Sequence, residues 1–458
     1  MTPGAASPSV VTAAPRPFLF RRPLADLWLR PWFDWYGLRF ISRYFFPVSR
    51  GWAEATQAGC TASRFRERFE LARKDSEGLD AAIASVGEAE RRYTERLDLW
   101  QRGFFGAAEL PPPALVSLEV ERARAALSFM AQRRLFGPWR RALPPATWEV
   151  ASHELVAERH GARLAAIADA YPLSADAAVE SSQAAPATWG TVSWLSFTSP
   201  VLGDRVTARV ETPPPPRDGP QPTLLLLHGI AMEDEMWGIR PDPVDHLRAA
   251  GWRIVKPEGP WHGRRRLPGR YGGEPVIGQG LDGFLTLFQA WVTEAAVLLD
   301  WARRQGGPVV LGGISLGALT AQLIATQARA WPAALVPDAL LLIATSGEVG
   351  ATAYAGSLAR ALGVPERLAE RGWMPDDLAP WLQLIEPGES AVPPERTVML
   401  LGRVDSVTPY DGGSLLADRW QVPSRNVFRP WQGHFSVSVG LSVFTKPLER
   451  LRQVLQER

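Results

Sequence analysis

The sequence contains only one cysteine, Cys60, among its 458 residues. An internal disulfide is therefore excluded, and a fold that rests on packing alone suits a reducing compartment such as the cytoplasm. Apolar stretches of about 18 residues, which a membrane-spanning helix needs, are also missing. The first twenty residues lack the apolar run of a secretion signal. We therefore expect a cytoplasmic protein, with any membrane contact peripheral.

The sequence also lacks an excess of charge of either sign, since its 50 Lys and Arg residues are nearly balanced by 48 Asp and Glu residues. This balance gives no reason to expect nucleic acid as a partner. Histidine pairs at metal-binding spacing and tight clusters of histidines with carboxylates are absent, so we expect no metal and no other cofactor. No residue pattern indicates an oligomeric state.

The chain divides into regions with different sequence patterns. Residues 1–22 are rich in proline and alanine and are expected to form a loose tail. Residues 23–185 mix apolar and charged positions at the spacing of helices, which predicts an all-helical region. In residues 186–458 short apolar runs alternate with helical stretches, which predicts an α/β domain with a mostly parallel sheet covered by helices on both faces.

Eight segments of this second region have the composition of β-strands. They are residues 191–198, 204–212, 223–227, 252–256, 308–312, 338–344, 397–401 and 426–430. The first two are expected to form an antiparallel pair, and the next four are continuous apolar runs, as strands buried on both faces should be. A helical insertion at about 351–384, after the sixth strand, is expected to form a short cap over the site.

A Gly-Ile-Ser-Leu-Gly motif at residues 313–317 directly follows an apolar strand and precedes a helix-like segment. A serine on such a sharp turn holds its hydroxyl clear of the backbone, and glycines are needed because the turn is crowded. The motif alone arises often by chance, but its position between a strand and a helix favours Ser315 as a nucleophile. The backbone N–H groups of Ile230, after the His228-Gly229 turn, and of Leu316 are the expected oxyanion donors.

Two further motifs supply an acid and a base. Asp405 follows the seventh predicted strand in a glycine-containing turn, and His434 follows the eighth. The order Ser315, Asp405, His434 is the order in which α/β-hydrolases carry a nucleophile, an orienting acid and a general base. Asp411, six residues beyond Asp405, and a purely structural role for either motif are the alternatives.

These motifs give the region from about residue 186 a resemblance to the α/β-hydrolase superfamily. The segment Pro-Trp-His-Gly-Arg-Arg at 260–265 and the segment Ala-Thr-Ser-Gly at 344–347 further resemble the α/β-hydrolase domain-containing 18 group and its bacterial relatives. The long helical N-terminal region departs from that group. The resemblance implies an eight-stranded α/β-hydrolase fold and a metal-free hydrolase of carboxylic esters, including acyl lipids, that acts through an acyl-enzyme on Ser315.

Other functions are compatible with the same three residues. Acyl transfer, peptide cleavage and carbon–carbon bond hydrolysis can all use this triad, and a non-catalytic binding protein can retain the fold. His228 and His262 are expected to bond to nearby loops rather than to act as bases, and the arginines at 264–266 are expected to pair with buried carboxylates or to hold an anionic substrate group.

Residues 18–52 are unusually aromatic and contain interleaved arginines. The aromatic residues are Phe18, Phe20, Trp28, Trp32, Phe33, Trp35, Tyr36, Phe40, Tyr44, Phe45, Phe46 and Trp52. Three interpretations remain open: the rings dock the helical region onto the α/β core, they contact the headgroup boundary of a membrane, or they bind a partner protein.

Overall fold

The computed structural model describes residues 10–12, 24–72, 77–174, 177–216, 219–233 and 242–457. The first part of these ranges is helical, as predicted. Its helices are α1 (Leu24–Trp28), α2 (Pro31–Phe40), the π-helix η2 (Ile41–Phe45), α3 (Phe46–Ala55), α4 (Ala62–Arg68), α5 (Leu79–Phe105), α6 (Pro112–Ala131), the 3-10 helix η4 (Gln132–Trp139), α7 (His153–Ala165) and the short 3-10 helix η5 (Ile167–Asp169).

A ten-stranded sheet follows, in the order β1-β3-β4-β6-β5-β7-β8-β9-β10 with β2 paired to β3. The strands are β1 (Glu180–Ser181), β2 (Ala185–Ala187), β3 (Gly190–Thr198), β4 (Arg205–Thr212), β5 (Thr223–Leu227), β6 (Arg253–Pro257), β7 (Val309–Ile314), β8 (Ala339–Ile343), β9 (Thr397–Leu400) and β10 (Val427–Phe428). β3 and β4 are antiparallel, and the strands from β6 to β10 along this order are parallel. The predicted mostly parallel sheet is therefore confirmed.

The prediction of eight strands was wrong by two. All eight predicted segments form strands, but β1 and β2 also pair antiparallel with β3. Both are very short and have no alternating apolar pattern, so only their neighbour in the fold fixes them as strands. The sheet therefore begins at Glu180, a few residues before the expected start of the α/β domain at 186.

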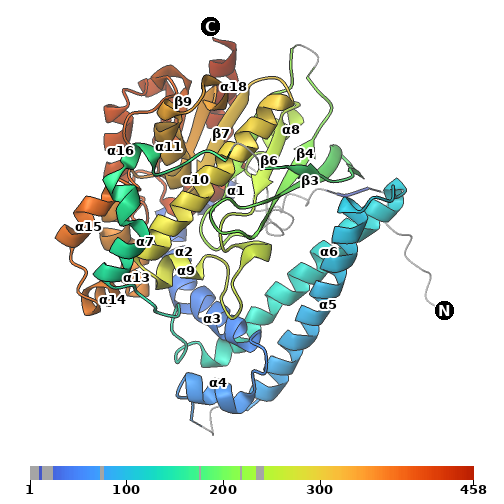
Figure 1. The fold of residues 1–458 in the computed structure, drawn as a ribbon, viewed down its shortest axis with the longest axis vertical. Coiled ribbons are helices and arrows are strands. Elements are labelled where there is room, and N and C mark those ends of the chain that lie inside the picture. The colour runs from blue at the N-terminus through green and yellow to red at the C-terminus, as the bar shows by residue number, and fades with distance from the viewer. Residues whose placement is uncertain are drawn as a thin grey trace.

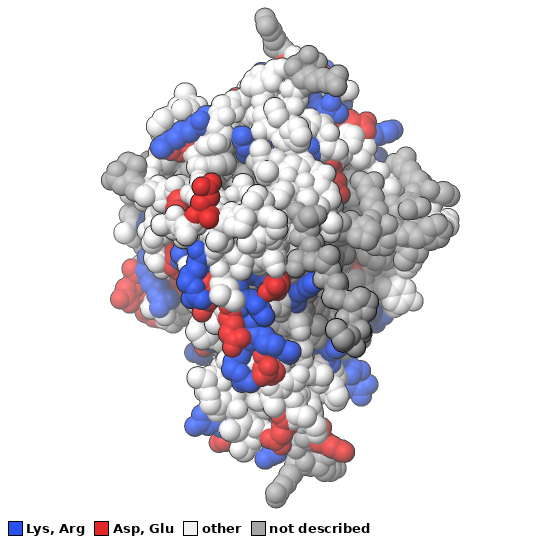
Figure 2. Space-filling view, turned by 90° about the vertical axis from the view of Figure 1, so that its right-hand side faces the viewer, with Lys and Arg blue, Asp and Glu red and all other residues white. Residues whose placement is uncertain are grey.

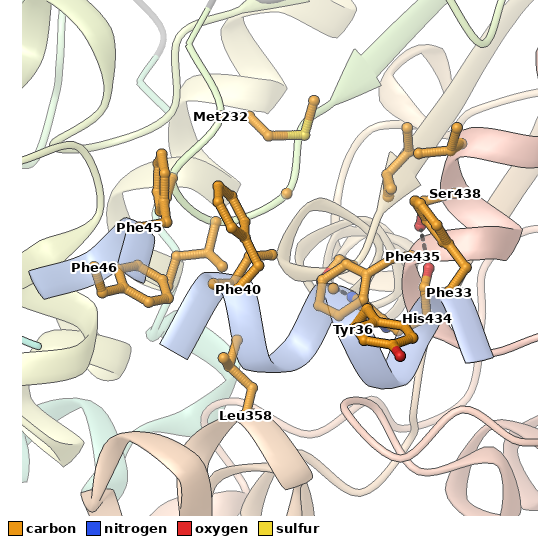
Figure 3. Close-up of a pocket in the computed structure, with 18 of the residues that line it drawn as sticks. Phe33, Tyr36, Phe40, Phe45, Phe46, Met232, Leu358, His434, Phe435 and Ser438 are labelled. Carbon is orange, nitrogen blue, oxygen red and sulfur yellow. Dashed lines mark hydrogen bonds between the residues drawn. The ribbon is translucent and has the colours of Figure 1, made fainter. Parts of the chain in front are cut away.

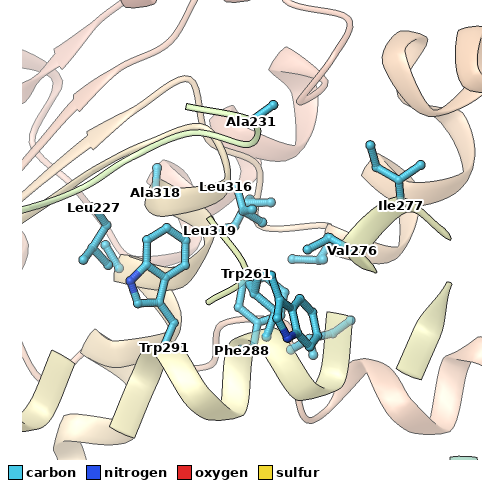
Figure 4. Packing of buried hydrophobic residues seen from close by; sticks show 14 of the residues in the cluster. Leu227, Ala231, Trp261, Val276, Ile277, Phe288, Trp291, Leu316, Ala318 and Leu319 are labelled. Atoms are coloured by element: carbon cyan, nitrogen blue, oxygen red, sulfur yellow. The ribbon is translucent and has the colours of Figure 1, made fainter. Parts of the chain in front are cut away.

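Helices cover both faces of the sheet (Figure 1). The helices of this region are α8 (Asp245–Ala249), α9 (Glu274–Gly278), α10 (Leu281–Arg304), α11 (Leu316–Gln327), α12 (Val349–Ala355), α13 (Ser357–Leu362), α14 (Val364–Glu370), α15 (Pro375–Leu382), α16 (Tyr410–Arg419), α17 (His434–Gly440) and α18 (Lys446–Gln456). Because side chains alternate along a strand, Leu225 and Leu227 of β5 pack with α10 and α11, whereas Leu224 and Leu226 pack with α8 and α18. Figure 4 shows the first of these cores, where Trp291 of α10 lies beside Leu227 and Ala318.

The N-terminal helices pack onto the sheet and onto its loops. The long antiparallel pair α5 and α6 (Figure 1) places Trp100 and Phe104 against Trp194 of β3. Most of residues 1–22 lie outside the described ranges. Val11 does not: it is buried, and its N–H donates to Pro186 O at 2.9 Å.

Buried ion pairs add to this contact between the two regions. Arg50 of α3 pairs with Glu54 and, at 3.3 Å, with Glu274 of α9. Arg133 of η4 pairs with Glu233 in the loop after β5. On the outer surface, basic and acidic side chains are interspersed on the face shown in Figure 2, as the balanced composition leads one to expect. No helix within the described ranges is both long and apolar enough to cross a membrane.

Candidate active site

Ser315 occupies a strained turn between β7 and α11. Its φ is 55° and its ψ is −120°, a conformation that costs a non-glycine residue about 1–3 kcal/mol. The glycines on either side have no room for a side chain. A Cβ on Gly313 would lie 2.2 Å from Gly317 O, and a Cβ on Gly317 would lie 2.2 Å from Leu227 O. The motif is therefore required by the backbone packing of this turn.

The structure brings together the three residues that the motifs indicated. His434 Nε2 lies 2.9 Å from Ser315 Oγ, and His434 Nδ1 lies 2.8 Å from Asp405 Oδ2. His434 is the first residue of α17, and both it and Asp405 are buried. With its Nδ1 proton donated to Asp405, the imidazole presents the lone pair of Nε2 to the serine hydroxyl. This is the geometry of a nucleophile activated by a general base.

Asp405 is held by a local network. Its Oδ1 accepts hydrogen bonds from the backbone N–H groups of Val407 at 2.9 Å and Thr408 at 3.1 Å. Thr408 Oγ1 lies 3.0 Å from Asp405 Oδ2. Asp411, the alternative acid, is exposed in the first turn of α16. The geometry therefore selects Asp405 as the partner of His434.

The loop predicted to supply one oxyanion donor lies against the nucleophile. A Cβ on Gly229 would be 3.5 Å from Ser315 Cβ, and Ile230 lines the same cavity as Ser315. Leu316, the other predicted donor, directly follows Ser315 as the first residue of α11. Both N–H groups are thus adjacent to the serine in the fold, and their catalytic role stays a prediction.

Two buried histidines brace this loop, in agreement with the structural roles expected for them. His262 Nε2 accepts from Ala231 N–H at 3.1 Å, and its Nδ1 donates to Pro260 O at 2.8 Å. His228 Nε2 accepts from Gly259 N–H at 2.9 Å. Burial lowers the pKa of His228 below its usual value, and burial together with the nearby His228 lowers the pKa of His262 well below it. Both imidazoles therefore stay neutral and keep their acceptor nitrogens.

The arginines at 264–266 pair with carboxylates rather than pointing into the site. Arg264 Nε donates to Glu258 at 2.9 Å, and Arg265 donates to both Asp204 and Glu294 at 2.7–2.9 Å. Arg266 pairs with Glu90 of α5 at 3.3 Å. Of the two roles expected for these arginines, pairing with carboxylates is therefore the one that the structure shows.

A cavity of about 600 Å³ opens at Ser315 and His434. Its described lining contains no Asp, Glu, Lys or Arg, and most of its wall is apolar. The wall residues are Trp28, Phe33, Tyr36, Gly37, Phe40, Ile41, Phe45, Phe46, Gly229, Ile230, Ala231, Met232, Pro243, Ile314, Leu358, Phe435, Ser438 and Val439. Figure 3 shows Phe33 and Tyr36 of α2 near His434 and Phe435, and Phe40 farther along the same helix beside Phe45. From the expected cap at 351–384 only Leu358 of α13 is among these residues.

Comparison with known proteins finds a family model that matches part of the chain, including this site. Residues 224–439 match the model of the Alpha/beta hydrolase family. The chain contains an α/β-hydrolase domain. The match includes the strands that carry Ser315, Asp405 and His434, and it supports hydrolase activity. No curated protein matches the chain, and nothing in the comparisons supports the narrower resemblance to the α/β-hydrolase domain-containing 18 group.

Solved structures similar to this one include three from bacteria. TT1662 from Thermus thermophilus is 21% identical with a TM-score of 0.37, over 57% of this chain and 98% of the other. Acetyl xylan esterase 1 from a Thermoanaerobacterium species is 17% identical with a TM-score of 0.42, over 65% and 96%. The rice cell wall degrading esterase LipA from Xanthomonas oryzae is 15% identical with a TM-score of 0.38, over 68% and 97%.

Sequence reasoning missed how the N-terminal helices contribute to the site of this α/β-hydrolase domain. Asp34 of α2 accepts hydrogen bonds from the N–H groups of Gly433 at 3.1 Å, Phe435 at 2.6 Å and Ser436 at 3.0 Å. It thereby caps the helix that begins with His434. A lone aspartate in an aromatic segment gives no hint of a partner some 400 residues away. Within the described ranges, no cluster of three or more His, Cys, Asp or Glu could hold a metal ion.

Proposed function

We propose that this protein hydrolyses carboxylic esters with an uncharged, apolar acyl group, including acyl lipids, through an acyl-enzyme on Ser315. The observation that carries the proposal is the continuous hydrogen-bonded chain from Ser315 through His434 to Asp405, 2.9 and 2.8 Å long in its two links. The apolar cavity that opens at the serine supports the choice of acyl group.

In the proposed reaction, Ser315 Oγ attacks the ester carbonyl while His434 Nε2 takes the hydroxyl proton. The oxyanion is stabilised by the N–H groups of Ile230 and Leu316. His434 then gives the proton to the leaving alcohol, and water repeats the cycle on the acyl-enzyme. Asp405 keeps the imidazole in the required tautomer and stabilises the imidazolium that forms.

The test is covalent labelling with a fluorophosphonate probe, which modifies only activated serines. Wild-type protein should be labelled in its native state and not after heat denaturation. Ser315→Ala should abolish labelling, whereas Ser438→Ala, which removes another serine of the cavity wall, should leave it intact. An unlabelled but folded wild type would contradict the proposal and favour a non-catalytic binding protein.

In a separate assay, unlabelled wild-type enzyme is given matched ester, amide and diketone substrates, with and without an acceptor alcohol. We expect ester hydrolysis to have the largest kcat/KM and to rise with acyl length until the cavity is filled. Preferred cleavage of the amide or the diketone, or preferred transfer to the alcohol, would replace ester hydrolysis by one of the other reactions that the triad can perform.

A further inference from the structure

One face of the α2–η2 helix is turned to solvent and is aromatic. Trp32, Trp35, Tyr36 and Phe40 are between 50% and 61% exposed. Spacings of three and four residues place them in a single stripe along the helix. A soluble protein rarely exposes so many large rings side by side, and such patches mark contacts with apolar partners.

The stripe continues with basic residues. Arg39 and Arg43 are exposed and follow the rings at the same helical spacing, and the Arg39 guanidinium lies 4.0 Å from the centre of the Trp35 ring. The acidic residue of this stretch, Asp34, is hydrogen-bonded on the inner side to α17. Interleaved aromatic and basic side chains on one helix face suit the headgroup boundary of a bilayer and attract anionic lipid.

The cavity and the stripe share residues. Tyr36 and Phe40 belong to the exposed stripe and also line the cavity that ends at Ser315. We propose that the outward face of α2 and η2, residues 32–43, docks on an anionic lipid surface. Docking itself does not depend on catalysis. The purpose that we assign to it, the passage of a lipid ester from the lipid surface to Ser315, rests on the proposed function.

The test is co-sedimentation of the full chain with vesicles of phosphatidylcholine, alone or mixed with phosphatidylglycerol. Wild type should bind the mixed vesicles best. The double variant Trp32→Ser/Trp35→Ser should bind at least about tenfold more weakly, since neither residue lines the cavity and both would insert between headgroups. Arg39→Gln/Arg43→Gln should lose the preference for the anionic vesicles.

Leu415→Ser, which changes a residue 56% exposed on α16, is the matched control and should bind like wild type. Fluorophosphonate labelling of each variant in solution should be unchanged, which separates failure of docking from failure of the proposed function. The proposal would be overturned if wild type bound neither type of vesicle. It would also be overturned if Leu415→Ser weakened vesicle binding as much as Trp32→Ser/Trp35→Ser. The proposal would also be overturned if wild type formed a dimer and bound no vesicles, while the tryptophan variant was a monomer, because the aromatic face would then be a contact between two copies of the chain.

The inner side of the same helix makes a second, independent contact with the site. Besides the N–H groups of Gly433, Phe435 and Ser436, Asp34 accepts from the Ser436 hydroxyl. Gln432 Nε2 donates to Leu29 O at 3.0 Å, so the residues on both sides of His434 are bound to the N-terminal segment. His434 itself starts α17, and its place depends on where this helix begins.

We infer that Asp34 is a positioning residue for His434, an inference that rests on the proposed function. An error of about 1 Å in the place of a catalytic group can cost about 10² in rate. Asp34→Ala should therefore lower kcat on a small soluble ester about tenfold to hundredfold, with KM within about twofold of wild type. Asp34→Asn keeps one acceptor oxygen and should recover part of the rate.

Asp80→Asn, which changes an exposed aspartate in the first turn of α5, is the control and should leave kcat unchanged. Thermal melting of each variant reports stability separately. A lowered melting temperature with unchanged kcat would show a merely structural role and overturn the inference, as would equal rates for the Ala and Asn variants. If Asp34→Ala does not fold, the inference is tested by Asp34→Asn alone: a kcat below that of wild type supports it, and a wild-type kcat overturns it. A wild type without any activity would instead contradict the proposed function.

Discussion

Asp405→Asn is a nearly isosteric change that removes one charge and one acceptor. In the native site Oδ1 accepts from two backbone N–H groups, of Val407 and Thr408, while Oδ2 accepts the Nδ1 proton of His434. An asparagine amide has only one acceptor oxygen. It must therefore present its NH₂ group either to His434 or to the two backbone donors.

Either orientation of the amide disturbs the site. If the NH₂ group faces His434, Nδ1 becomes an acceptor and the proton moves to Nε2, where it blocks the acceptance of a proton from Ser315. If the NH₂ group faces the backbone, two buried N–H groups lose their partner, which costs about 1–3 kcal/mol each. The first orientation is the cheaper one, so the protein should fold with the wrong tautomer.

We therefore expect Asp405→Asn to lower kcat/KM for ester hydrolysis about 10³–10⁴-fold, or about 4–5.5 kcal/mol of transition-state stabilisation. Stability should fall by no more than about 2 kcal/mol in urea unfolding. Asp411→Asn, in the exposed first turn of α16, is the control and should behave like wild type. An Asp405→Asn enzyme with more than about a tenth of wild-type activity would refute this reasoning.

Three further predictions concern stability. Gly317→Ala should destabilise the fold by about 3 kcal/mol or more in urea unfolding, because its Cβ would meet Leu227 O at 2.2 Å; a normal melting curve would contradict this. Arg50→Ala should cost about 3–5 kcal/mol, since Glu54 loses its ion-pair partner and the buried Glu274 loses one of its two, keeping Arg270 at 3.4 Å; Arg91→Ala, at an exposed pair, should cost less than about 1 kcal/mol. The pKa of His262 is lowered on folding, so as the pH drops below about 6.5 its imidazole takes up a proton in the unfolded chain but stays neutral in the native protein. The free energy of unfolding therefore falls with the pH in this range. His262→Gln should reduce the slope of unfolding free energy against pH between 7 and 5 by up to about 1.4 kcal/mol per pH unit, and an unchanged slope would show that His262 does not titrate on unfolding.

Prediction from sequence succeeded where local pattern and tertiary position coincide. Strands buried on both faces must be continuous apolar runs, so β5, β7 and β8 were recognisable. Ser315, Asp405 and His434 were found because each follows a strand of a parallel sheet, whose carboxyl ends meet at one edge.

Prediction failed where only the assembled fold decides. β1 and β2 are strands because β3 offers them an edge, and their own residues carry no strand pattern. The aromatic segment left three interpretations open, because large rings occur in cores, at membrane surfaces and at contacts with partner proteins. In the fold its two sides differ: Phe33 and Gly37 face the site, while Trp32 and Trp35 are exposed.

The most direct test of an acyl-enzyme on Ser315 is rapid mixing of the enzyme with a p-nitrophenyl ester, followed by acid quenching and mass spectrometry. We predict a burst of nitrophenol equal to the concentration of active sites, and one acyl group on the peptide that contains Ser315. Ester hydrolysis without a burst, or with the acyl group on another residue, would contradict the account.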